Sequence, residues 1–132
     1  MSRRASQVDA SEYQEQAALF TWWNVYRRTV KLDERLLLAI PNGAYLAGDA
    51  RRRAIQMARL KAAGLRPGAP DVFLAVPRGS WHGLFIEMKS SKGKASVEQN
   101  SYLGLLELQY YDIAVCHGAT EAIALIKTYL KA

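Results

Sequence analysis

Apolar residues near the start of the chain recur at steps of three and four residues, which is the spacing of one face of a helix. The positions that carry this pattern are Ala18, Leu19, Trp22, Trp23 and Tyr26. Ser11 can act as the N-cap of such a helix. We therefore predict an amphipathic helix over residues 11–28, preceded by a flexible N-terminus at residues 1–10.

A second helical pattern occupies the middle of the chain, where Asp49 can cap the start and Gly64 follows the end at Ala63. The apolar positions that we expect to face inward are Ile55, Met57, Ala58 and Leu60. The positions that we expect mostly outward are Arg51, Arg52, Arg53, Arg59 and Lys61. This helix is the most basic segment of the chain.

Short apolar runs predict the strands. Residues 36–40 form one such run, and Pro41-Asn42-Gly43 ends it in a turn. Residues 71–76 and 84–89 are separated by a turn that contains Pro77, Gly79 and Gly83, so we predict an antiparallel hairpin. A further buried strand is expected at residues 113–116.

Two more helices are predicted in the second half of the chain. Ser96 and, three residues later, Gln99 match a capping box that opens a helix to Leu108. Thr120 begins a last helix. The resulting order predicts a single α/β domain over residues 11–132, in which helices flank a mixed central sheet and a helical crossover leads to the last strand.

The composition narrows the class of protein. The 132 residues suffice for one domain, and the formal net charge of +6 favours an anionic partner such as nucleic acid. The single cysteine, Cys116, excludes an internal disulfide and fits a reducing cytoplasm. It most often packs as a small hydrophobe, and neither His82 nor His117 has a partner at metal-ligand spacing. We expect a soluble cytoplasmic protein without membrane contact or organic cofactor.

The chemically distinctive residues lie on the predicted hairpin. Successive side chains of a strand alternate, so Glu87 and Lys89 share one face, and Asp71 at the start of the neighbouring strand can lie close to Glu87. Two adjacent carboxylates, with the backbone carbonyl of Met88, suit Mg²⁺, which needs few protein ligands when phosphate completes its shell. Lys89 can then hold the attacking water and stabilise the charge of the transition state. Alone, the E-x-K triplet is weak evidence for a nuclease site, because ordinary exposed strands also carry it.

Further motifs strengthen this interpretation. With Gly68-Ala69-Pro70-Asp71 and Glu87-Met88-Lys89 in place, the chain resembles the PD-(D/E)XK nuclease superfamily. It is more specifically similar to the virus-type replication-repair nuclease (VRR-NUC) family. The features shared with that family also include Glu12 with Gln16, Pro41-Asn42-Gly43 and Gln99.

The resemblance implies a role for each of these positions. It implies a metal site built from Asp71 and Glu87, a catalytic Lys89, and supporting roles for Glu12 and Gln99. Glu12 is also a possible metal ligand, through a water or a second ion, and Glu15 competes with it for that place.

Six residues outside this set, five of them basic, are candidates for binding the DNA backbone without reading its sequence. They are Arg51, Arg52 and Arg53 of the basic helix, Lys92 and Lys94 beside the proposed site, and the loop residue Asn42. A solvated helix face explains any single one of the arginines nearly as well.

From the residues and the resemblance together, we predict a Mg²⁺-dependent endodeoxyribonuclease in which Mn²⁺ can substitute. The resemblance further suggests a homodimer that acts on branched DNA such as Holliday junctions. Two alternatives stay open: a nuclease for flap or single-stranded DNA, and a catalytically silent DNA-binding module on the same fold.

Overall fold

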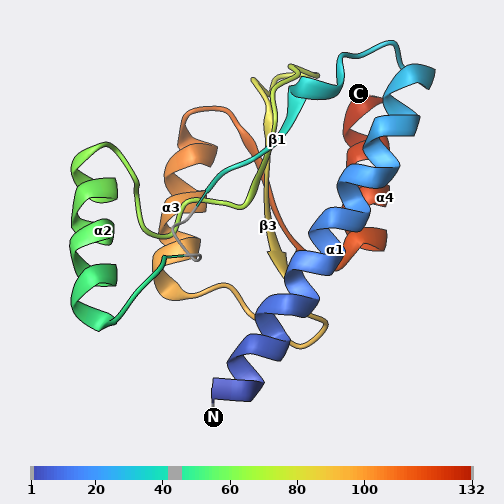
Figure 1. Cartoon of the computed structure of the whole chain (residues 1–132). Coiled ribbons are helices and arrows are strands. Elements are labelled where there is room, and N and C mark those ends of the chain that lie inside the picture. Colours follow the sequence, from blue (N-terminus) through green and yellow to red (C-terminus); the bar gives the residue numbers. More distant parts are fainter. Residues whose placement is uncertain (1, 42–45, 132) are drawn as a thin grey trace.

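The structure is a computed structural model, and it describes residues 2–41 and 46–131. A small sheet lies at its centre, with α1 and α4 on one face and α3 on the other (Figure 1). The elements in chain order are α1 (Ser2–Thr29), the short 3₁₀ helix η1 (Glu34–Leu36), β1 (Leu37–Ala39), α2 (Ala50–Ala62), β2 (Val72–Leu74), β3 (Leu84–Lys89), α3 (Val97–Leu108), β4 (Asp112–His117) and α4 (Ala119–Leu130). The predicted α/β class with a mixed sheet flanked by helices is confirmed.

The sheet has the order β1-β2-β3-β4. The first three strands are antiparallel neighbours, and the register pairs Val72 with Ile86 and Leu74 with Leu84. β4 runs parallel to β3 and is reached through α3, as a crossover connection requires. Both the predicted hairpin and the predicted helical crossover are therefore confirmed.

The hydrophobic core lies between one face of the sheet and the helices α1 and α4. From the hairpin, Leu84, Ile86 and Met88 are buried there. The helices contribute fully buried side chains that include Leu19, Trp23, Ala122 and Ile126. Core packing of Trp23 and Cys116 is thus confirmed, and the Trp23 indole N–H also donates to the carbonyl of Glu34 at 3.0 Å.

Two predicted helices differ from the structure. α1 begins at Ser2, nine residues before the predicted start, so Ser11 lies within the helix and does not cap it. The second difference concerns α2, none of whose residues is buried in the described structure. Ile55 and Leu60, expected to face inward, are 44% and 38% exposed.

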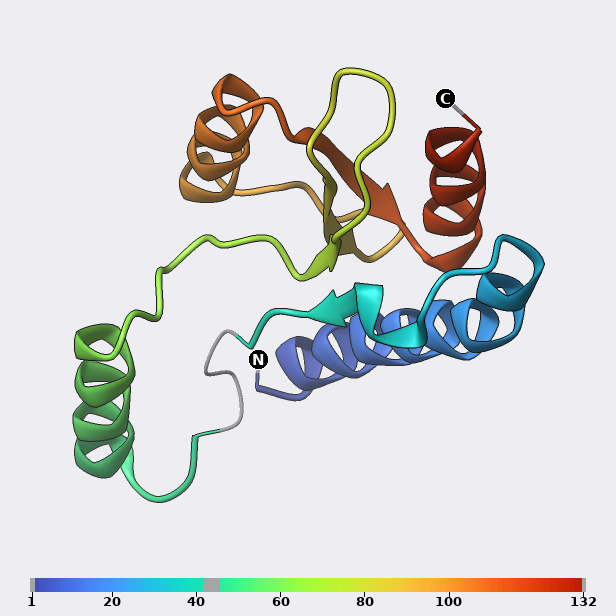
Figure 2. The same cartoon turned by 90° about the horizontal axis from the view of Figure 1, so that it is seen from above.

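α2 stands apart from the sheet in both views (Figures 1 and 2). Its ends are nevertheless well formed: the Asp49 side chain accepts from the amide of Arg52, and Gln56 exchanges hydrogen bonds with the backbone of Ala47. The cap was predicted correctly, whereas the packing of the apolar face was not.

Asn42 of the predicted turn lies outside the described residues. Within the described chain, no helix is both long enough and apolar enough to cross a membrane.

Candidate active site

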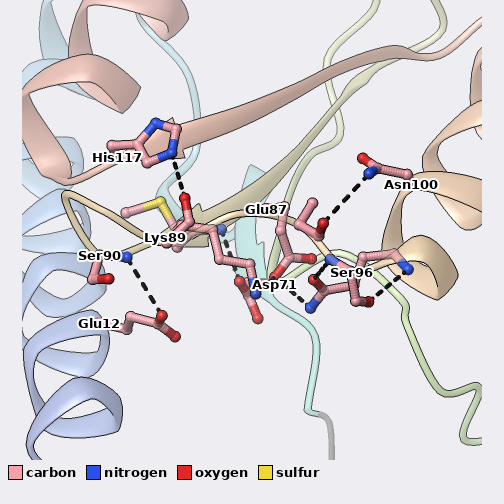
Figure 3. Close-up of polar contacts among 12 residues, drawn as sticks. Glu12, Asp71, Glu87, Lys89, Ser90, Ser96, Asn100 and His117 are labelled. Carbon is pink, nitrogen blue, oxygen red and sulfur yellow. Dashed lines mark hydrogen bonds and ion pairs between the residues drawn. The ribbon is translucent and has the colours of Figure 1, made fainter.

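The hairpin places Asp71 and Glu87 side by side. Because Val72 pairs with Ile86, the antiparallel register extended by one residue sets Asp71 opposite Glu87. The carboxylate of Asp71 accepts a hydrogen bond from the backbone N–H of Met88 at 2.8 Å (Figure 3). Pro70, immediately before it, is fully buried, which fixes the chain where Asp71 leads into β2.

Glu87 is the buried carboxyl group of the site, with only 2% of its surface exposed. Its Oε1 atom accepts from the side-chain amide of Gln99 at 3.2 Å and lies 3.9 Å from Nζ of Lys89. Its Oε2 atom is buried and has no hydrogen-bond partner among the described residues. A buried acceptor without a partner is costly, so this oxygen suits a shared proton or a bound cation.

The surroundings of Glu87 make it hard to ionise. Burial foremost, followed by the hydrogen bond that a protonated carboxyl can share with Asp71 and by the charge of Asp71, raises the pKa of Glu87 to about 9, although Lys89 opposes the shift. Two carboxyl groups this close favour sharing one proton when no cation is present. A divalent cation would take the place of that proton.

Gln99 fulfils two roles at once. It completes a capping box at the start of α3, since Ser96 Oγ accepts from its backbone N–H at 3.1 Å and its Oε1 accepts from the Ser96 N–H at 2.8 Å. Its remaining Nε2 group points to Glu87. The capping prediction is confirmed, and the same contact makes the helix start a support for the buried carboxyl.

Of the two glutamates on α1, Glu12 faces the end of β3. Its carboxylate accepts from the backbone N–H of Ser90 at 3.4 Å (Figure 3), and its charge contributes to the raised pKa of Glu87. Glu15 instead lies against Gly118 at the start of α4, because its Oε1 would be 2.7 Å from a Cβ atom at that glycine. A helix N-terminus favours such a negative charge.

The donor set fits a divalent cation that keeps most of its own water. Within residues 2–41 and 46–131, no three histidine, cysteine or acidic side chains come together closely enough to hold a metal ion. Mg²⁺ is commonly bound by one or two carboxylates plus substrate phosphate. The residues that would hold it are Asp71 and Glu87, and the unpartnered oxygen of Glu87 is the observation that favours this.

The predicted DNA-binding cations fall into two groups. Lys92 and Lys94 are exposed in the loop that directly follows Lys89. Arg51, Arg52 and Arg53 are exposed on α2, which is separated from the end of β3 in Figures 1 and 2. Only the lysines lie beside the site.

The sequence interpretation missed the contacts that hold the loop of residues 90–95, which carries Lys92 and Lys94. The Ser90 N–H bond to Glu12 and a 2.8 Å contact between His117 Nε2 and the Gly93 carbonyl both fasten it. Neither contact has a sequence signal, because each joins positions far apart in the chain. His117 comes close to Gly93 only because the parallel register of β3 and β4 pairs Lys89 with His117.

Comparison with known proteins identifies the family and the fold of the chain. The VRR-NUC domain family matches residues 2–120. A solved structure of a VRR_NUC domain protein has a TM-score of 0.72 and 23% sequence identity, over 92% of this chain and 88% of that one, which shows a shared fold. A search of curated proteins finds no match. The family match spans most of the chain, and the chain therefore belongs to the VRR-NUC family of nuclease domains.

Proposed function

We propose that this nuclease domain is a divalent-metal-dependent, structure-selective endodeoxyribonuclease whose natural ion is Mg²⁺, with Mn²⁺ able to substitute. The observation that carries the proposal is the buried, unpartnered Oε2 atom of Glu87 beside the Asp71 carboxyl. A bound Mg²⁺ would activate a water and offset charge on the phosphate. Membership of the VRR-NUC family supports nuclease activity in general. The proposed metal dependence rests on the pair of carboxyl groups at Asp71 and Glu87.

Each residue of the proposed site has a role that its contacts support. Asp71 and Glu87 bind the cation, to which the Met88 carbonyl can add a further ligand. Lys89, 3.9 Å from Glu87 and with 15% of its side chain exposed, orients the attacking water and stabilises the phosphate charge. Gln99 holds Glu87 in place, and Glu12 holds the end of β3.

The test is cleavage of labelled DNA with Mg²⁺, with Mn²⁺ and with EDTA. We expect cleavage with either ion and none with EDTA. Asp71→Asn should lower the rate by at least about 100-fold, because a neutral amide binds a cation poorly. Glu107→Gln, which neutralises an exposed carboxylate elsewhere on α3, is the matched control and should leave the rate unchanged. Undiminished cleavage in EDTA would refute the metal dependence.

The same experiment separates the second candidate, a catalytically silent DNA-binding module. Such a module would bind DNA and cleave nothing with either ion. A binding-only protein gains nothing from a buried pair of carboxyl groups near phosphate, since their charges repel the ligand. That argument favours the nuclease.

For the substrate we propose branched DNA, such as a Holliday junction, cleaved by a homodimer. One small domain carries one site, and two copies related by a two-fold axis would present two sites to opposing strands. Flap or single-stranded DNA is the alternative substrate. A panel of junction, flap, duplex and single-stranded DNA distinguishes them by relative rate.

A further inference from the structure

The loop between β3 and α3, residues 90–95, is fastened to the rest of the domain at three points. At its start, the Ser90 N–H donates to Glu12 on α1. In its middle, the Gly93 carbonyl lies 2.8 Å from Nε2 of His117 at the end of β4. At its end, the Asn100 side chain donates to the Ala95 carbonyl at 3.4 Å. A surface loop held at three points has little freedom to move.

His117 provides the central fastening. A carbonyl only accepts hydrogen bonds, so Nε2 must carry the proton and donate to Gly93. The other ring nitrogen, Nδ1, lies 3.7 Å from Glu121 on α4. His117 therefore connects the loop to β4 through one ring nitrogen (Figure 3). Its other ring nitrogen faces the carboxylate of Glu121 on α4.

The backbone at Gly93 is folded tightly against the end of β3. A Cβ atom there would lie 3.1 Å from Ser90 Oγ and 3.3 Å from Cβ of Lys89. The Gly93 N–H also donates to the Ser90 carbonyl at 3.0 Å. Lys92 and Lys94, both exposed, flank this fixed point. Neither forms an ion pair with any side chain in the part of the chain that the structure describes.

We propose that His117 is a positioning residue for DNA: through the Gly93 carbonyl it fixes Lys92 and Lys94 beside Lys89, where they bind a backbone phosphate next to the cleaved bond. The inference rests on the proposed function, because it takes DNA as the ligand of the two lysines. His117 itself touches no reacting atom. Its effect should therefore appear in DNA affinity and not in the rate of the bound complex.

The test begins with His117→Ala in the full chain, using DNA of one fixed sequence and shape. Loss of one hydrogen bond that orders the loop should weaken binding about 3- to 10-fold. The slope of log affinity against log salt should fall by about one, because phosphate contacts loosen. The single-turnover rate at saturating DNA should change by less than about two-fold.

Two conservative variants distinguish this role from general packing. The side-chain amide nitrogen of glutamine can occupy the position of Nε2, whereas that of asparagine matches Nδ1 and stops short of Gly93. His117→Gln should therefore bind DNA nearly as well as wild type, and His117→Asn should bind as weakly as His117→Ala. Glu121→Gln, which alters only the Nδ1 side, is the matched control and should bind normally.

A double-mutant cycle gives the decisive result. In a Lys92→Ala/Lys94→Ala background, His117→Ala should cause no further loss of affinity, because its effect passes through those lysines. A full additional loss in that background, or wild-type affinity of His117→Ala alone, would overturn the proposal.

Amide hydrogen exchange of residues 90–95 in DNA-free protein measures directly how often the backbone of the loop opens. We expect faster exchange in His117→Ala and His117→Asn, and wild-type exchange in His117→Gln. Unchanged exchange in all three variants would also refute the positioning role. If wild-type protein binds no DNA at all, the proposed function fails instead, which is a separate outcome.

Discussion

Glu87 places a titratable carboxyl group in the core, where a side chain that never ionises would make the folded state more stable. Its side chain is 2% exposed, and its neighbour across the hairpin is a second carboxyl group. Such an arrangement lowers the stability of the folded state, and functional sites are where proteins tolerate that cost. The raised pKa makes the cost measurable.

We predict that Glu87→Gln stabilises the metal-free protein while abolishing cleavage. In the folded state the pKa of Glu87 is raised from 4.5 to about 9. Between these values the unfolded chain releases a proton that the folded chain keeps, so the wild-type stability falls as pH rises. Glutamine does not titrate. The variant should gain about 1–2 kcal/mol at pH 8 and little at pH 4.

Urea denaturation in EDTA at the two pH values measures this difference. Glu107→Gln, an exposed carboxylate on α3, should show no such dependence on pH. A Glu87→Gln protein less stable than wild type at pH 8 would contradict the raised pKa.

Lys89 should act on the reaction and Lys92 on binding. We predict that Lys89→Met lowers the single-turnover rate by at least about 100-fold, because a charge near the reacting phosphate is lost, while DNA binds within a few-fold of wild type. Lys92→Met should show the converse, with weaker binding and an unchanged saturated rate. Rapid-quench kinetics at saturating DNA tests both, and equal rate losses in the two variants would argue against distinct roles.

At the level of elements, the hairpin was predictable because its rules are local. Alternation along β3 sets Glu87 and Lys89 on one face, and the turn fixes an antiparallel register that brings Asp71 opposite Glu87. The capping box of α3 is equally local. The further contact, from Gln99 to Glu87, lies outside that motif, and the resemblance to the family implied only a supporting role for Gln99.

Long-range placement was not predictable from the pattern. The apolar residues of α2 identify one face of the helix, but nothing in the sequence says whether another element covers that face. The structure leaves Ile55 and Leu60 exposed. The His117 contact with Gly93 depends on the register in which β3 and β4 pair, with Lys89 beside His117. The helical crossover to β4 was predicted, but the local spacing of the residues does not encode that register.

The separate position of α2 leads to a prediction about its arginines. Replacing Arg51, Arg52 and Arg53 together by Gln should weaken DNA binding and reduce the salt slope by up to about three, if all three contact phosphates. The saturated cleavage rate should stay within about two-fold, because α2 stands apart from the site. Arg35→Gln, whose guanidinium pairs with Asp33 at 2.9 Å, is the control. If the triple variant binds DNA with unaltered affinity, the three arginines of α2 face solvent and do not contact DNA.

For the whole molecule, the number of sites decides how a junction is cut. We predict that the protein is a dimer by light scattering and that it cleaves a four-way junction faster than flap, duplex or single-stranded DNA. In a dimer formed from wild-type and Asp71→Asn chains, only one site is active. Such mixed dimers should nick one strand of the junction, whereas wild-type dimers cut two opposing strands. A monomeric mass, or equal rates on all four DNA shapes, would exclude paired cleavage of a junction by two symmetric sites.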